Sequence, residues 1–462
     1  GEGPDVLHLI EAMHTCVEWC RQSDLPVLWM LQHVSPLLPV SQATDRDLQF
    51  FGQVRGLLPA ALFSESALMM AGVPAARVDS WVQLLSIEAA GLQPLIDDDG
   101  LLLAPWGTAE QYRLFVLNKL RWAIRTALGD LPPAELETTL AIMLTVFNQA
   151  SEAQSSIVQE TLAVYANIEA EKVLPTLNWA GTTVAGLLRQ IKDLPMTEAE
   201  QPRRARTESP PELLGVLAQV RRFSEIVTQL DLSANLLEDY LAYGAQAWIG
   251  HLPEDFSLST LYYLTVMTQA ITMSEQPEQD LLDYFQEVNE LREGLSGDAL
   301  TLAQKAAEIR LALFLGWSVQ DVHECLLHIV PTTKVLKNLA QLDVLMRLRR
   351  LSAESGMDAK TILLIGKLPE EDVGNAYEAA AEFAWLSDEP LVPVIPRAGD
   401  LDQLVNVVWT LSPATVIANK PGEKAVYTVT VTDADNKPIS GLRLNWQTTL
   451  GDIVSNDTNL QG

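Results

Sequence analysis

The chain has 462 residues, of which 48% are hydrophobic and 20% are charged, and its formal net charge at pH 7 is −29. This length and hydrophobic content predict two or three folded domains and exclude wholesale disorder. The acidity argues against nucleic acid and against an anionic lipid surface as partners, because both attract basic protein faces.

The N-terminal residues show no targeting signal. The sequence begins Gly-Glu-Gly-Pro, without an initiator methionine or a signal-peptide pattern. No apolar run approaches the roughly 18–20 residues that a membrane-spanning helix needs. We therefore expect an internal piece of a larger protein.

Three cysteines occur: Cys16, Cys20 and Cys325. So few thiols form no disulfide framework, which favours folding in a reducing cytoplasm. Cys16 and Cys20 are four residues apart on an expected helix, as two buried thiols on one helix face commonly are. We favour that interpretation over a metal or redox role.

Apolar residues recur every three or four positions from Val6 to about Leu368, which predicts amphipathic helices. Within 40–190, Thr108-x-x-Gln111 predicts a capping box at the start of a helix, and residues 97–100 predict a polar turn. Residues 197–212 are polar, contain three prolines and predict an exposed loop. In that loop, Arg203, Arg204 and Arg206 offer a protease-sensitive site, although a solvated linker is the simpler interpretation.

Residues 213–365 contain four expected helix pairs. The second helix of each pair begins near one of four anchors, which are 45, 41 and 40 residues apart: Leu236, Leu281, Val322 and Ile362. This spacing approaches the roughly 40–47-residue period of helix-pair solenoids. Ser318-x-x-Asp321 predicts a capping box, and Gly316 and Gly356 are expected to end helices in the left-handed conformation.

The periodicity changes after Pro390. The proline-containing run 391–396 cannot be helical and predicts an extended connector. From Ala425 the period is two, because Tyr427, Val429 and Val431 alternate with threonines. Further alternating residues follow a turn at 433–438, as in a β-sandwich. Only three or four strands fit before the last residue, so we expect an incomplete module.

No catalytic, cofactor-binding or metal-binding residue is predicted. His323 and His328 are five positions apart, about 140° around a helix, so one zinc ion cannot bind both. We find no nucleophile elbow and no histidine beside a candidate nucleophile. We therefore expect no enzyme and no cofactor. An enzyme with a site built from scattered carboxylates is the most distant alternative.

Several segments of the helical region resemble the A subunits of bacterial Tc (toxin complex) insecticidal toxins. These are packing motifs, and the similarity extends over about residues 1–385. The matching segments are 12–36, 62–68, 158–162, 258–264 and 340–348.

Residues 412–462 resemble instead the bacterial Ig-like repeat of invasin-type adhesins. The matching segments are 429–438, 441–446 and 449–451. A-subunit shells of the Tc family carry inserted Ig-like receptor-binding domains, so the order of parts is compatible with that family. The Ig type found here is typical of adhesins.

The Tc resemblance implies a secreted or cell-surface, pore-forming translocator that is a homopentamer. It implies Tc B–C cocoon subunits and a host cell-surface receptor or glycan as partners, with membrane contact through other parts of the subunit. It also implies a shell that opens on a pH change. The alternative is a helical-repeat interaction scaffold with an adhesin-like tail.

The fold class expected is mainly α, an irregular helix-pair shell, followed by an incomplete Ig-like β-sandwich. The expected organisation is a first shell part (1–196), a linker loop (197–212), a second, repeat-like shell part (213–390), a connector (391–411) and the truncated sandwich (412–462).

Overall fold

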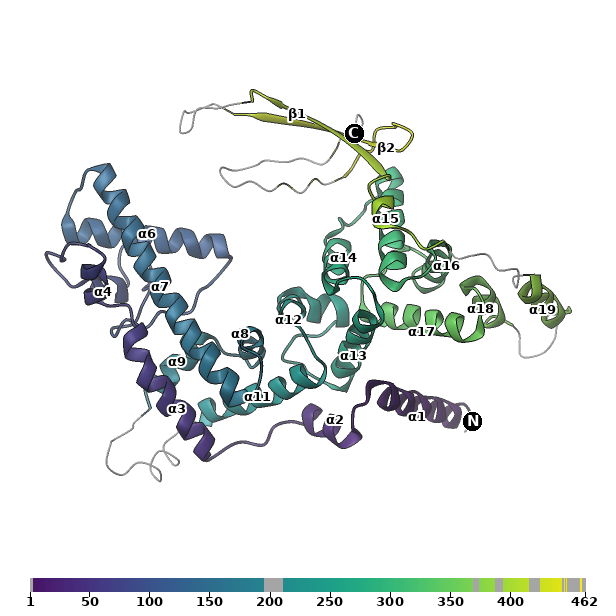
Figure 1. The fold of residues 1–462 in the computed structure, drawn as a ribbon, viewed down its shortest axis with the longest axis horizontal. Coiled ribbons are helices and arrows are strands. Elements are labelled where there is room, and N and C mark those ends of the chain that lie inside the picture. The colour runs from purple at the N-terminus through teal and green to yellow at the C-terminus, as the bar shows by residue number, and fades with distance from the viewer. Residues whose placement is uncertain are drawn as a thin grey trace. The chain divides into compact units, whose positions relative to one another are not determined.

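The structure, a computed structural model, describes residues 3–194, 211–368, 374–386, 394–414 and 424–442, together with Leu444, Trp446 and Thr458. The described chain is mainly helical, with a two-stranded antiparallel sheet toward its C-terminal end (Figure 1). This confirms the prediction of a helical region followed by a partial β region. None of the helices in these ranges is both long and apolar enough to cross a membrane.

The chain divides into two compact units. Unit 1 comprises residues 1–242 and 252–258, and unit 2 comprises residues 243–251 and 259–462. The boundary falls inside one helical element, η2 (Tyr240–Ile249). The domain limits predicted from the sequence follow changes in sequence pattern, not contacts between residues, and they stay a prediction.

Unit 1 consists of helices joined by short loops. Its elements are α1 (Gly3–Ser23), α2 (Val27–Val34), α3 (Asp45–Leu57), η1 (Leu58–Ala61), α4 (Glu65–Met70), α5 (Trp81–Ser86), α6 (Ala109–Leu128), α7 (Pro133–Ala166), α8 (Ala170–Trp179), α9 (Val184–Lys192), α11 (Pro211–Gln229) and α12 (Ala234–Asp239).

The 34-residue helix α7 takes part in two hydrophobic cores of unit 1. Its first half buries Met143 and Phe147 with residues of α5 and α6. Its second half buries Val158 and Leu162 with residues of α3, α9 and α11. Between the halves, the buried side chain of Gln154 accepts from the backbone of Leu102 at 3.1 Å and donates to that of Ala61 at 3.0 Å. One helix therefore holds both cores together.

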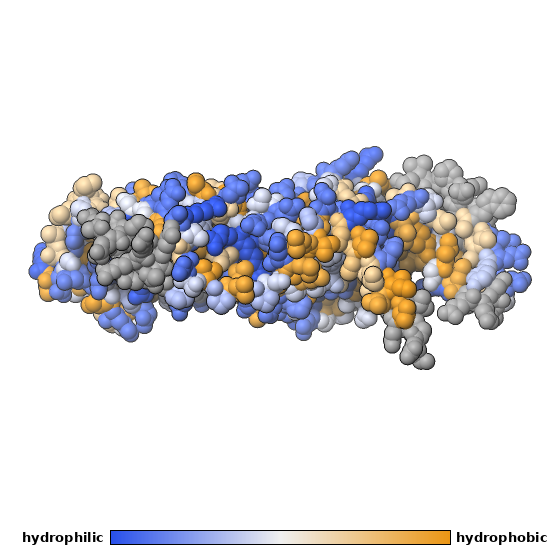
Figure 2. Space-filling view, turned by 90° about the horizontal axis from the view of Figure 1, so that it is seen from below, coloured by the Kyte–Doolittle hydropathy of each residue, from blue (hydrophilic) through white to orange (hydrophobic). Residues whose placement is uncertain are grey.

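The first two helices carry apolar side chains at the surface. Five hydrophobic residues of α1 that recur at helical spacing are 54–63% exposed: Val6, Leu9, Ile10, Met13 and Val17. Cys16 is exposed as well, so the interpretation of Cys16 and Cys20 as two buried thiols was wrong. That interpretation assumed that the apolar face of α1 packs against other residues, whereas this face is exposed in the structure. Figure 2 shows the surface from below Figure 1, where apolar residues lie among hydrophilic ones.

Unit 2 contains consecutive helix pairs, α13 (Leu258–Met273) with α14 (Glu278–Glu290), α15 (Gly297–Leu315) with α16 (Val319–Ile329), and α17 (Leu339–Ser355) with α18 (Ala359–Ile365). Neighbours along the chain pack against each other from α14 to α18. Of the four predicted anchors, Leu236, Leu281 and Val322 are buried, whereas Ile362 is only partly buried. The first of the four predicted pairs, α11 with α12, belongs to unit 1.

The predicted helix ends agree with the structure, except that the capping box at Ser318 forms on one side only. Gly316 and Gly356 end α15 and α17 with φ of 57° and 72°, in the left-handed region that favours glycine. Ser318 caps α16 by accepting from the backbone nitrogen of Asp321 at 3.1 Å. Thr108 and Gln111 form the predicted capping box of α6.

Element η2 is a π-helix, a rare form in which each turn holds about one residue more than an α-helical turn. The backbone nitrogen of Gly250 accordingly donates to the carbonyl of Ala245, five residues earlier, at 3.0 Å. Inside the element, the buried Trp248 ring lies against Gly244, where an added Cβ would be 2.6 Å from the ring. Glycine is therefore required for this close approach.

The remaining described elements of unit 2 are α19 (Ala376–Leu386), η3 (Ala398–Asp400), β1 (Val405–Ser412) and β2 (Val426–Asp433). The strands pair antiparallel, with Val405 opposite Asp433 and Ser412 opposite Val426. Val431 and Ile439 are buried in a small cluster with Ala299 of α15. Alternation in β2 is as predicted, whereas β1 begins within residues expected to be a connector.

Candidate functional site

A polar network inside unit 1 centres on the carboxylate of Asp47, which is 1% exposed. Asp47 lies in the first turn of α3, where its Oδ2 accepts from the backbone nitrogen and hydroxyl of Thr44 at 2.7 and 2.8 Å. Its Oδ1 accepts from the Tyr165 hydroxyl of α7 at 2.5 Å and from Arg221 Nη1 of α11 at 3.1 Å. One carboxylate therefore caps a helix and joins it to two others.

The network changes the ionisation of its members. Burial alone would raise the pKa of Asp47, but the hydrogen bonds from Tyr165 and Thr44 and the charge of Arg221 outweigh it and lower that pKa. Burial, followed by the hydrogen bond to Asp47, raises the pKa of Tyr165. The carboxylate is therefore held charged and the phenol neutral at neutral pH.

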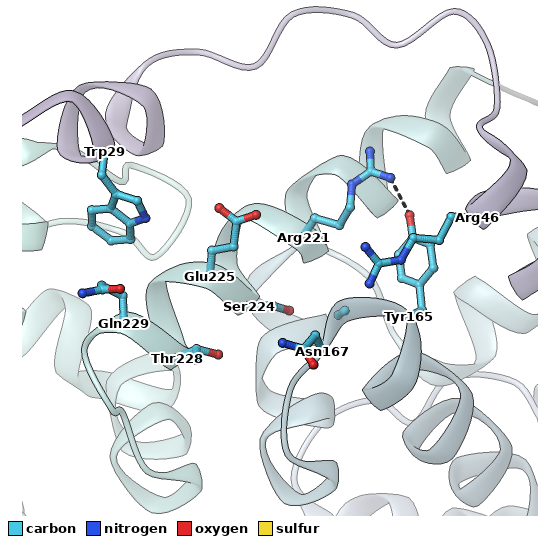
Figure 3. A pocket seen from close by; sticks show the side chains of 10 residues that line it. Trp29, Arg46, Tyr165, Asn167, Arg221, Ser224, Glu225, Thr228 and Gln229 are labelled. Atoms are coloured by element: carbon cyan, nitrogen blue, oxygen red, sulfur yellow. Dashed lines mark hydrogen bonds between the residues drawn. The ribbon is translucent and has the colours of Figure 1, made fainter. Parts of the chain in front are cut away.

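A pocket of about 340 Å³ opens beside this network (Figure 3). Its lining comes from α2, α3, the end of α7 and one face of α11. The lining residues are Trp29, Arg46, Tyr165, Ala166, Asn167, Arg221, Ser224, Glu225, Thr228 and Gln229.

Two arginines lie at the Tyr165 side of the pocket (Figure 3). The guanidinium carbons of Arg46 and Arg221 are 5.3 and 5.8 Å from the centroid of the Tyr165 ring. Arg221 also donates to the Tyr165 hydroxyl at 2.7 Å and pairs with Asp47. Arg46 has no ion pair with any residue of the described ranges, so this side of the pocket is positively charged.

Trp29, the part of the lining that comes from α2, is held in place through contacts of His33 with α11. The ring of Trp29 stacks on the His33 ring at 4.1 Å between centroids. His33 Nε2 lies 2.7 Å from Glu225 Oε2, and its Nδ1 lies 2.8 Å from the Trp29 carbonyl oxygen. Arg222 Nε donates to the His33 carbonyl at 2.5 Å. These contacts fix α2 on α11 and so position Trp29 at the pocket.

Ser224, beside the pocket, has a buried hydroxyl without a partner among the described residues. Its side chain is 1% exposed, and its Oγ has no hydrogen bond within the part of the chain that the structure describes. No general base is therefore positioned to activate this hydroxyl as a nucleophile. The arrangement of charged and polar groups is suited to binding.

A second pocket of unit 1 differs in charge. It has a volume of about 660 Å³ and is lined partly by α8, with Trp179 at its wall and Glu238 and Glu254 as its charged residues. Acidic lining of this kind follows from the overall charge of −29. The pocket at Tyr165 departs from that composition, so we treat it as the candidate site.

Sequence reasoning did not find this site, and the residues that it singled out lie elsewhere. Arg203, Arg204 and Arg206 fall within 195–210, outside the described residues, so the protease-sensitive loop stays a prediction. His323 instead contacts Glu308, with Nδ1 2.7 Å from Oε1. Within the described ranges, no three His, Cys, Asp or Glu side chains come together as metal ligands.

Comparison with known proteins gives one distant relative. The chain is 22% identical over 322 residues to toxin subunit YenA1 of Yersinia entomophaga, a match that covers 67% of this chain and 26% of YenA1. The chain thus spans about a quarter of the length of the curated relative that it matches. No family model matches the sequence. The similarity supports a toxin-related function at the level of a distant family relationship.

Proposed function

We propose that this chain is a non-catalytic, helical part of the A subunit of a Tc-type insecticidal toxin. The observation that carries the proposal is the similarity to toxin subunit YenA1 over 322 residues. In this role the helices form part of the outer shell of a secreted homopentamer that binds Tc B–C subunits. The shell encloses a translocation channel formed by other parts of the subunit.

The burial of the resembling motifs supports this proposal. Leu68, Val158 and Leu162 are buried in the cores of unit 1. Leu264 and Leu345 are buried in unit 2. Four of the five resembling segments, 62–68, 158–162, 258–264 and 340–348, therefore contribute to helix packing, whereas 12–36 carries exposed apolar side chains.

We further propose that the β region begins an Ig-like module that binds a host receptor or glycan. The alternation in β2, with Val429 and Val431 on the face that packs on Ala299, supports a strand covered on one side. Trp409 and Tyr427 remain exposed, and their ring centroids are 6.3 Å apart. An aromatic surface of this kind is suited to contact with another molecule.

The consecutive helix pairs of unit 2 favour a second candidate, an interaction scaffold built from helical repeats. The two candidates differ in assembly and in toxicity. A shell subunit forms a large closed oligomer and requires its partner subunits for toxicity, whereas a scaffold does neither.

Electron microscopy and mass photometry of the full-length protein that contains this chain test the choice. Five-fold particles, together with insect toxicity that depends on co-expressed B and C subunits, are the expected result. A monomeric or dimeric full-length protein without toxicity contradicts the toxin proposal and supports the scaffold.

A further inference from the structure

We propose that the pocket at Tyr165 binds a small molecule that carries a carboxylate at one end and hydrogen-bond donors at the other. This site goes beyond the proposed shell function, which needs no small-molecule ligand. Three features of the pocket favour such a ligand: its charge, an unpaired buried hydroxyl beside it, and the polar groups across from the arginines.

The charge of the pocket favours an anion. The guanidinium groups of Arg46 and Arg221 both lie close to the Tyr165 ring. Asp47 balances one of these charges, and its two oxygens already accept four hydrogen bonds. Glu225, the other carboxylate at the pocket, contacts His33, so the positive charge that Asp47 leaves unbalanced is local to the Tyr165 side. A carboxylate matches the planar fork of a guanidinium and would relieve the repulsion between the two arginines.

The hydroxyl of Ser224 supplies an independent indication of a ligand. Buried polar side chains nearly always have a hydrogen-bond partner, and a serine within a helix commonly donates to the carbonyl four residues earlier. Ser224 has neither kind of partner among the described residues, and it lines the pocket. The Oγ atom is closed to solvent in the structure, so a small shift of the pocket lining would have to open it before a bound molecule could supply the missing partner.

The groups away from the arginines select the other end of the ligand. Glu225 is an acceptor whose Oε2 already contacts His33, and Thr228 follows it on the same face of α11 (Figure 3). Glu225 would repel a second negative charge on the ligand and would accept from a hydroxyl or an ammonium group. The volume of about 340 Å³ lies at the low end of small-molecule pockets. A monocarboxylate with hydroxyl or ammonium donors fits these conditions.

Titration calorimetry of the purified 462-residue chain, at fixed ionic strength, tests the proposal with three probes. D-glucuronate offers a carboxylate with hydroxyls, L-threonine offers a carboxylate with an ammonium group, and D-glucose offers hydroxyls alone. We expect saturable binding of glucuronate or threonine and none of glucose. Binding of glucuronate would identify hydroxyl donors at the Glu225 end of the ligand, and binding of threonine would identify an ammonium group there.

Variants locate the binding. Arg46→Gln is expected to lower the affinity for the carboxylate probe at least tenfold, because it removes the guanidinium charge that Asp47 does not balance. Arg125→Gln, at an exposed arginine of α6 outside the pocket, is the matched control and should bind as the parent does. Ser224→Ala should weaken binding several-fold while leaving the thermal midpoint equal or higher, since it removes an unpaired buried hydroxyl.

Three results would overturn the proposal. The first is an absence of saturable binding for both carboxylates. The second is glucose binding as tightly as glucuronate, which would remove the role of the carboxylate. The third is equal affinity in the Arg46→Gln and Arg125→Gln variants. Circular dichroism shows whether each variant is folded, and Ser224→Ala keeps the test valid if Arg46→Gln is not.

Discussion

Asp321 of α16 accepts a hydrogen bond from the backbone nitrogen of Ala359, the first residue of α18, at 2.8 Å. Its other carboxylate oxygen receives the hydroxyl of Ser318, the N-cap of α16. A single side chain therefore connects the starts of two helices that belong to successive pairs. The predicted capping box forms only on the Ser318 side, because the carboxylate bonds to the next pair.

Replacement of this carboxylate should cost stability. Asp321→Ala leaves the buried backbone nitrogen of Ala359 unpaired, which costs about 1–3 kcal/mol of unfolding free energy. Asp298→Ala is the matched control, since Asp298 also lies in a first helical turn but is exposed. The control should lose only about 0.3–1 kcal/mol. Equal losses in urea unfolding would show that the bond to Ala359 contributes nothing.

Asp47 should make unit 1 sensitive to acid. Its pKa is lowered in the folded state, so its contribution to stability is present above the ordinary value of 3.8 and is lost as the pH falls below that value. Asp47→Asn should lower the unfolding free energy by about 1–3 kcal/mol at pH 7. The difference from the parent should shrink as the pH falls below 3.8. Denaturant unfolding at several pH values measures it, and a difference independent of pH contradicts the network described here.

Two glycines in helical elements should respond to alanine with opposite signs. Gly244→Ala places a methyl group against the Trp248 ring and should destabilise the chain by about 1–3 kcal/mol. Gly215 of α11 has nothing within 4 Å of an added Cβ, so Gly215→Ala should stabilise by up to about 1 kcal/mol. Thermal unfolding of the two variants compares them directly. Stabilisation by Gly244→Ala would contradict the close packing of η2.

The cysteines should differ in reactivity toward a thiol reagent such as Ellman's reagent. Cys16 is exposed and should react at once. Burial, followed by the charges of Asp321 and Glu324, raises the pKa of Cys325 to about 12. Cys325 should therefore react only after unfolding. A Cys16→Ser variant should lose the part of the fast phase that Cys16 contributes, while the partly exposed Cys20 still reacts. Fast labelling of Cys325 in the folded chain would contradict its burial.

The arginine-rich loop should be the first site of limited trypsin digestion. Arg203, Arg204 and Arg206 precede α11 in a proline-containing, polar stretch. Mass spectrometry of early fragments should find new N-termini at Arg204, Ala205 or Thr207. Replacement of the three arginines by glutamine should slow this cleavage. First cuts elsewhere, for example at Arg113, would contradict the prediction.

The helix pairs and their ends could be predicted from the sequence because their signals are local. Gly316 ends a helix within one turn of its own position, and Ser318 caps the next helix three residues from its partner. Strand β2 was found for the same reason. Strand β1 was missed because Val407 and Val408 interrupt its alternation, and its pairing with β2 spans a long connection.

The candidate site could not be predicted because no local pattern contains it. Trp29, Arg46, Tyr165 and Arg221 come from four helices and meet only after the cores have packed. Each looks ordinary in its own segment, as a surface arginine or an apolar aromatic residue. The spacing of Arg221, Ser224 and Glu225 does place them on one helix face, but only the fold shows that this face borders a pocket.

The π-helical geometry of η2 has a consequence for changes in chain length. Tyr240 and Trp248 are both buried, and both belong to η2. Deletion of one residue between them, such as Ala242, would turn the side chain of Trp248 by about 100° around the helix axis relative to that of Tyr240. The two aromatic rings could not both keep their places. The length of this short stretch is therefore constrained as well as its glycine at position 244, although its backbone form is the less common one.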